Sequence, residues 1–217
     1  MKYYPVFLDI AGKPCAVVGG GEVALRKAQR LLQCHAMVLV IAEELSPDWE
    51  ALQGEDNLHF IHGKYDPRHI EGMFLVIGAT NNREVNERIF QDAQRLQILV
   101  NIVDEPMRCD FILPSLVERG DLSVAISTGG KSPAMAKRLR KELEDTLGTE
   151  YEIALRIMGD IRRIVQEKNQ PSPDNQKIFD RLIYSDMLPL IREKDWHGVR
   201  KLIANIVPEA ENIELPS

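Results

Sequence analysis

The fold is decided by residues 13–24, whose sequence is KPCAVVGGGEVA. The apolar run ends in three glycines, and a segment of helical character follows over residues 22–33. This order of strand, glycine turn and helix is typical of a dinucleotide-binding unit, with Gly19, Gly21 and Ala24 at the fingerprint positions. The competing interpretation is a glycine-rich turn in an α/β protein that binds no cofactor.

Each fingerprint position has its own physical reason. Gly19 permits the tight turn, Gly21 has no Cβ and lets a pyrophosphate approach the backbone, and Ala24 allows the helix to pack close to the strand. The start of the helix offers unpaired N–H groups and a partial positive charge to phosphates. We therefore predict that Gly19, Gly20 and Gly21 bind the cofactor.

The composition limits the class of protein. The chain has 217 residues, of which 44% are hydrophobic and 28% charged, as expected for a globular protein with one medium domain and a smaller one. A net charge of −6 argues against nucleic acid as a partner. No apolar run approaches the roughly 20 residues of a membrane span, and no signal peptide is recognisable, so we expect a cytoplasmic protein without a membrane partner. The three scattered cysteines and the five histidines lack metal-ligand spacing, which predicts no bound metal.

Four more apolar runs of strand length follow, with helical segments between several of them. We expect strands at about residues 37–41, 58–62, 73–78 and 98–103. Residues 6–10 read as a short strand or an extended arm, and Asn82 as the cap of a helix that runs to about Arg95. Continuous apolar runs are typical of parallel strands buried on both faces. The predicted fold class is α/β, with a Rossmann-type doubly wound parallel sheet.

Polar residues follow three of these strands. Glu43 and Glu44 come after the second strand, and Glu43 lies 19 residues beyond Ala24, where an acidic residue binds the ribose hydroxyls and favours NAD over NADP. Two solvated glutamates are the competing interpretation. Thr80 follows the fourth strand and is a candidate for the cofactor crevice. Asp104 follows the fifth strand, where it could act as a base or a cation ligand, or simply start the turn before a proline.

The pattern changes after Pro114. Residues 116–126 read as a hairpin, and Ser132 as the cap of a helix that ends near Leu147. The loop at residues 127–133, STGGKSP, lacks the spacing of an ATP-binding loop but remains a candidate anion site. Between positions 108 and 141, seven basic residues exceed three acidic ones, a local charge of +4 that predicts an anionic substrate unless it is only a solvated helix face. The seven are Arg108, Arg119, Lys131, Lys137, Arg138, Arg140 and Lys141.

The remaining residues predict a helical region. A helix is expected over about residues 151–167, a polar loop over 168–175, and two or three shorter helices after it. The last ten or so residues are expected to be frayed.

Five blocks of the sequence together resemble one family. They are residues 17–24 with 26–28, residues 79–81, residues 101–104 with Pro106, residues 109–111 with Pro114, and residues 127–133. Over about residues 3–148 the chain is similar to precorrin-2 dehydrogenase/sirohydrochlorin ferrochelatase, also found as the N-terminal module of bifunctional sirohaem synthase. The resemblance implies NAD-dependent removal of two hydrogens from precorrin-2, giving sirohydrochlorin, and in some members insertion of ferrous iron to give sirohaem. The methyltransferase domain of the fused synthase is not expected here.

The resemblance also implies roles for single residues. Glu22 and Val23 would contact the cofactor pyrophosphate, with Glu43 and Glu44 near the adenosine ribose. Asp104 matches the family's essential aspartate, which is implicated in dehydrogenation and, where present, chelation.

Substrate contacts are expected from Asn101, Ser127 and Lys131, and Ser127 occupies a position that can be phosphorylated in some relatives. The family is dimeric, so a homodimer is implied. The resemblance also implies three parts of the chain: an NAD-binding Rossmann domain at residues 1–113, a small α+β dimerisation and substrate segment at 114–147, and a C-terminal helical domain at 148–217. At His35 relatives usually have glycine, and histidine tolerates the left-handed conformation only at some cost.

Two other functions stay open. The first is an NAD-sensing regulatory Rossmann module without catalysis, which would need the glycine turn and Glu43 but not Asp104. The second is a dehydrogenase that does not use ferrous iron as a substrate.

Overall fold

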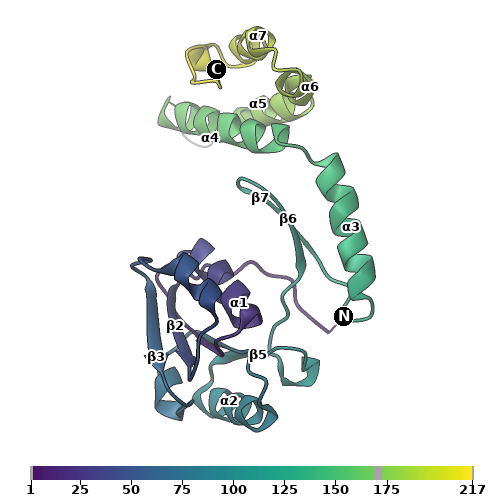
Figure 1. Ribbon diagram of the computed structural model, residues 1–217. Helices are drawn as coiled ribbons and strands as arrows, with labels where there is room; N and C mark the ends of the chain where they lie inside the picture. Colours follow the sequence, from purple (N-terminus) through teal and green to yellow (C-terminus); the bar gives the residue numbers. More distant parts are fainter. Residues whose placement is uncertain (1, 169–172, 217) are drawn as a thin grey trace. The chain divides into compact units, whose positions relative to one another are not determined.

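The computed structural model describes residues 2–168 and 173–216 and forms two compact units (Figure 1). The first unit ends at Leu113 and the second begins at Pro114. No helix in the described part of the chain is long and apolar enough to cross a membrane.

The first unit is built on a five-stranded parallel sheet with the order β3-β2-β1-β4-β5. Its strands are β1 (Pro14–Val18), β2 (Met37–Ala42), β3 (Leu58–His62), β4 (Leu75–Gly78) and β5 (Leu99–Ile102). Val18 is in register with Ile41 and with Gly78, so the carboxyl ends of β1, β2 and β4 lie at one edge of the sheet. The predicted parallel sheet is confirmed, and residues 6–10 form an arm without strand structure.

Alternate residues of the strands build two cores, one on each face of the sheet. Helix α1 (Glu22–Gln33) packs with Cys15 and Val17 on one face, and α2 (Arg83–Leu96) packs with Ala16 and Val18 on the other. Short 3-10 helices at Pro47–Leu52 (η1) and Pro67–Ile70 (η2) complete the two layers. The sheet is therefore covered on both faces, as a doubly wound fold requires.

The helix ends follow the predicted chemistry. The Asn82 side chain accepts hydrogen bonds from the N–H groups of Glu84 (2.9 Å) and Val85 (3.2 Å), which caps α2. His35 follows the end of α1 with φ of +57°, so a histidine does take the left-handed conformation there.

The second unit begins with a hairpin of β6 (Ser115–Arg119) and β7 (Leu122–Ile126), followed by α3 (Pro133–Thr146). Among the described residues of this unit, four helices come next, which are α4 (Glu150–Lys168), α5 (Pro173–Ile183), α6 (Met187–Arg192) and α7 (Trp196–Ile206). Ile157, Ile161, Leu182 and Ile203 are fully buried among these helices.

Two expectations for this region were wrong. A polar loop was expected over residues 168–175, but α4 includes Lys168 and α5 begins at Pro173. Proline suits the first turn of a helix. Residues 169–172 lie outside the described residues. The last ten residues were expected to be frayed, but Ala210 and Ile213 are buried in the helical core. A short 3-10 turn, Pro208–Ala210 (η4), brings them there.

Candidate cofactor site

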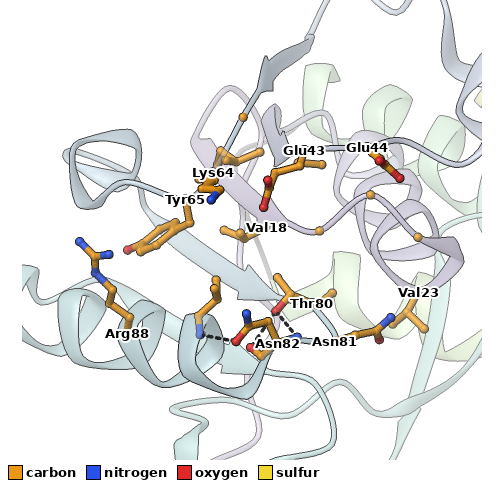
Figure 2. Close-up of a pocket in the computed structure, with 18 of the residues that line it drawn as sticks. Val18, Val23, Glu43, Glu44, Lys64, Tyr65, Thr80, Asn81, Asn82 and Arg88 are labelled. Atoms are coloured by element: carbon orange, nitrogen blue, oxygen red, sulfur yellow. Dashed lines mark hydrogen bonds between the residues drawn. The ribbon is translucent and has the colours of Figure 1, made fainter.

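A cleft of about 650 Å³ lies at the carboxyl ends of β1, β2 and β4 (Figure 2). Every predicted cofactor-binding residue lines it. These residues are Gly19, Gly20, Gly21, Glu22, Val23, Glu43, Glu44 and Thr80. Because the chain leaves each parallel strand at the same edge, segments far apart in the sequence meet there.

The three glycines are needed for different reasons. At Gly19 φ is +133°, and an added Cβ would lie 2.4 Å from the carbonyl oxygen of Ala79. At Gly20 an added Cβ would lie 1.8 Å from the carbonyl oxygen of Glu44. At Gly21 the space is open, with no atom within 4 Å of the added Cβ. The first two glycines are thus required for folding, whereas the third leaves room above the helix.

The glycine loop is fastened to the end of β2. The Gly19 N–H donates to Ile41 O at 2.9 Å. The carbonyl of Gly20 accepts two hydrogen bonds, from Ser46 N at 2.9 Å and from Trp49 Nε1 at 2.8 Å. Trp49 is buried and packs edge-on against Phe60, with ring centroids 5.6 Å apart. Sequence reasoning missed Trp49, because nothing in a lone tryptophan 29 residues downstream signals this contact.

The first turn of α1 can accept an anion. Gly21 is the N-cap residue and has no side chain to bond the first N–H groups, so these donors stay available to a ligand. Together with the open space at Gly21, this arrangement fits the pyrophosphate of a dinucleotide.

The walls of the cleft carry charges of both signs. Glu43 and Glu44 are exposed at the end of β2, while the Thr80 hydroxyl donates to Asn86 Oδ1 at 2.7 Å. Lys64, Tyr65 and Arg88 also line the cleft, on the wall away from Val23 in Figure 2, and the sequence did not predict them. Burial raises the pKa of Tyr65, and the Asp92 carboxylate, to which the hydroxyl donates at 3.2 Å, adds to the effect.

Asp104 lies outside the lining of the cleft, two residues beyond β5. It is exposed and has φ of +61°, a conformation uncommon outside glycine, asparagine and aspartate. It is the third residue of a turn that Glu105 N closes to Ile102 O at 3.2 Å. Lys27 of α1 is half-buried, and burial lowers its pKa, with Arg26 adding to the effect and the nearby Asp104 carboxylate opposing it.

The residues expected to bind substrate are not brought together in the first unit. Asn101 is buried, and its amide donates to Phe111 O at 2.9 Å. Ser127 and Lys131 are exposed in the second unit, where the Ser127 hydroxyl accepts from Gly129 N at 3.1 Å. Their contacts with substrate stay predictions.

The basic segment carries less unpaired positive charge than the count between positions 108 and 141 suggested. Arg138 pairs with Glu142 and Arg140 with Glu144, both acidic residues lying just past position 141. Arg119 donates to the carbonyls of Leu147 and Glu144 at the end of α3. Arg108 belongs to the first unit, where it pairs with Glu87 and Glu105. Exposed positive charge is left on Lys131, Lys137 and Lys141.

Comparisons with known proteins agree with this geometry. A family described as putative NAD(P)-binding matches residues 6–115, and the central region of sirohaem biosynthesis protein matches residues 119–146. The chain belongs to the putative NAD(P)-binding family. A nicotinamide dinucleotide is therefore the class of cofactor for the cleft.

Relatives cover nearly the whole chain. Siroheme synthase 2 of Aeromonas hydrophila is 35% identical over 213 residues, which are 98% of this chain and 45% of that protein. Siroheme synthase of Mannheimia succiniciproducens is 34% identical over 93% of this chain and 42% of that protein. The chain spans less than half the length of these relatives. The resemblance to the sirohaem synthase family is thereby confirmed.

A solved structure shares the fold. SirC, described as a precorrin-2 dehydrogenase, aligns with a TM-score of 0.76 over 94% of this chain and 98% of its own, at 24% identity. At that identity the likeness establishes the fold, including the helical region after the Rossmann unit.

Proposed function

We propose that this chain oxidises precorrin-2 to sirohydrochlorin, with NAD as the hydride acceptor. The observation that carries the proposal is the exposed Asp104 carboxylate, held in a left-handed turn at the same sheet edge as the dinucleotide cleft. The siroheme synthase relatives and the fold of SirC support this substrate.

The reaction removes a hydride and a proton from the macrocycle. Bound NAD supplies the hydride acceptor. The chain must supply a base for the proton, and the exposed Asp104 carboxylate, which interacts with the half-buried Lys27, can take it. The glycine loop and the start of α1 hold the pyrophosphate meanwhile.

NAD is favoured over NADP because Glu43 and Glu44 stand at the end of β2, where a 2′-phosphate would meet their negative charge. Initial rates of reduction of the two cofactors test this choice. Glu43→Gln is expected to narrow the preference for NAD, and an unchanged preference would contradict the assignment.

The remaining roles follow from the same proposal. The tetrapyrrole, which carries many carboxylates, would be contacted by Asn101, Ser127 and Lys131. The segment 114–147 would form a homodimer, and residues 148–217 a helical domain. Ferrous iron would be a second substrate. Its insertion requires the removal of two pyrrolic protons, which Asp104 could assist by accepting one proton at a time and passing it to solvent.

Anaerobic turnover of precorrin-2 with NAD, followed by ferrous iron, tests the proposal on wild type and Asp104→Asn. Asparagine tolerates positive φ, so the variant is expected to fold and bind NAD while losing about a hundredfold in rate. NADH formation without accelerated loss of sirohydrochlorin would leave a dehydrogenase that is not a chelatase. NAD binding without any NADH formation would overturn the proposal in favour of an NAD-sensing module.

A further inference from the structure

The segment 109–111 runs antiparallel beside β5, the edge strand of the sheet. Asp110 N donates to Val100 O at 2.9 Å, and the Asp110 carboxylate accepts from Val100 N at 3.1 Å. Asn101 Nδ2 donates to Phe111 O at 2.9 Å. These bonds satisfy an edge that would otherwise be open and fix the segment alongside the strand.

Cys109 stands at the end of this segment that faces the Asp104 turn. Its Sγ lies 3.3 Å from Ile102 O and 3.3 Å from Glu105 O, the carbonyls at the two ends of the turn. Asn101 Nδ2 lies 3.5 Å from the same sulfur and can donate to it. The thiol, which has one proton to donate, therefore lies within hydrogen-bond distance of the carbonyls of both the first and the last residue of the turn in which Asp104 is the third.

The turn needs such support. Left-handed backbone is costly for a residue with a Cβ and persists only where its surroundings determine it. The second support is Arg108, which pairs with Glu105 and with Glu87 of α2. A turn held from both sides fixes the direction of the Cα–Cβ bond of Asp104 and so limits where its carboxylate can lie, as positioning of a base requires.

We propose that Cys109 is a positioning residue, whose thiol holds the turn so that the Asp104 carboxylate keeps its direction. The inference rests on the proposed function, in which Asp104 takes the proton. Burial raises the pKa of the Cys109 thiol, so the sulfur keeps the proton that it donates. Serine retains a donor at this position, whereas alanine and valine do not.

The test compares Cys109→Ala, Cys109→Val and Cys109→Ser with wild type, and with the exposed Cys34→Ala as a matched control. Two readouts are made on each protein. The first is hydrogen exchange of the peptide that contains residues 102–108, which needs no turnover. The second is kcat for precorrin-2 oxidation alongside the Kd for NAD.

Loss of the donor is expected to speed exchange at Glu105 N–H about fivefold. It is also expected to lower kcat about tenfold, with NAD affinity within twofold of wild type. Cys109→Ser is expected to show exchange and kcat close to those of wild type. In the Asp104→Asn background, Cys109→Ala is expected to lower the rate no further. Unchanged exchange in the alanine and valine variants, or faster exchange with unchanged kcat, would overturn the inference. If wild type itself forms no NADH, the proposed function fails, while the exchange data still decide whether the thiol holds the turn.

Discussion

The glycine loop before α1, in the first unit, and the glycine loop before α3, in the second, use their donors differently. The loop at Gly19–Gly21 is fastened by its carbonyl at Gly20 and leaves the first turn of α1 without a side-chain cap. In the loop at residues 127–132, Ser132 caps α3 through Met135 N, Thr128 accepts from Ser132 N, and Ser127 accepts from Gly129 N. The first loop leaves backbone N–H donors available to a ligand, whereas in the second loop these donors form hydrogen bonds with the loop's own side chains.

The comparison teaches that a glycine loop before a helix does not by itself make an anion site. The hydroxyl side chains of the second loop suggested an anion site, but they accept hydrogen bonds from the N–H groups that an anion would need. Four variants test this difference.

The largest effect is expected from Gly20→Ala. Its Cβ would collide with Glu44 O, so we expect a loss of about 3 kcal/mol in the free energy of unfolding of the first unit. Gly129→Ala is the matched control, because its Cβ would meet no atom within 4 Å and only the φ of +62° is unfavourable, at about 1 kcal/mol. Urea unfolding measures both losses: the fluorescence of Trp49 in a Trp196→Phe background follows the first unit, and that of Trp196 in a Trp49→Phe background follows the second. Equal losses would show that the first loop is not sterically constrained.

Gly21→Ala is expected to act on binding instead of folding. The position has φ of −86° and open space, so stability should be unchanged. The new methyl group would obstruct the pyrophosphate and weaken NAD binding about tenfold. Calorimetric titration with NAD and a thermal melt separate the two effects. An unchanged affinity for NAD would show that the pyrophosphate does not bind at this loop.

Trp49→Phe is expected to weaken NAD binding about fivefold, because Gly20 O loses one of its two donors and the loop loosens. Trp196→Phe, in the second unit, serves as the control and should leave NAD affinity as it was. If both substitutions have the same effect on the Kd, the indole does not position the loop.

Ser132→Ala should have the smallest effect on binding. Loss of the cap of α3 is expected to cost about 1 kcal/mol of stability while NAD affinity stays constant. A thermal melt and the same titration measure the outcome. Weaker NAD binding in this variant would mean that the second loop also serves the cofactor.

The cofactor side of the molecule was readable because its residues directly follow strands. Gly19, Glu43 and Thr80 come just after β1, β2 and β4, and parallel strands bring such residues to one edge without further information. The net charge of the basic segment depended on where the counted residues ended, and the anionic substrate stays a prediction. The window stopped at position 141, one residue before Glu142 and three before Glu144, which pair with its arginines one helical turn away.

By itself, the sequence determined the strands, most of the helices and the edge of the sheet where the predicted cofactor residues lie, because apolar periodicity and glycine placement are local properties. Only the tertiary structure decided which groups hold the loops. Trp49 reaches Gly20 across 29 residues, and Cys109 reaches the two ends of the Asp104 turn. Such contacts depend on how separate segments pack, and a hydrogen bond between distant residues leaves no periodic trace in the chain.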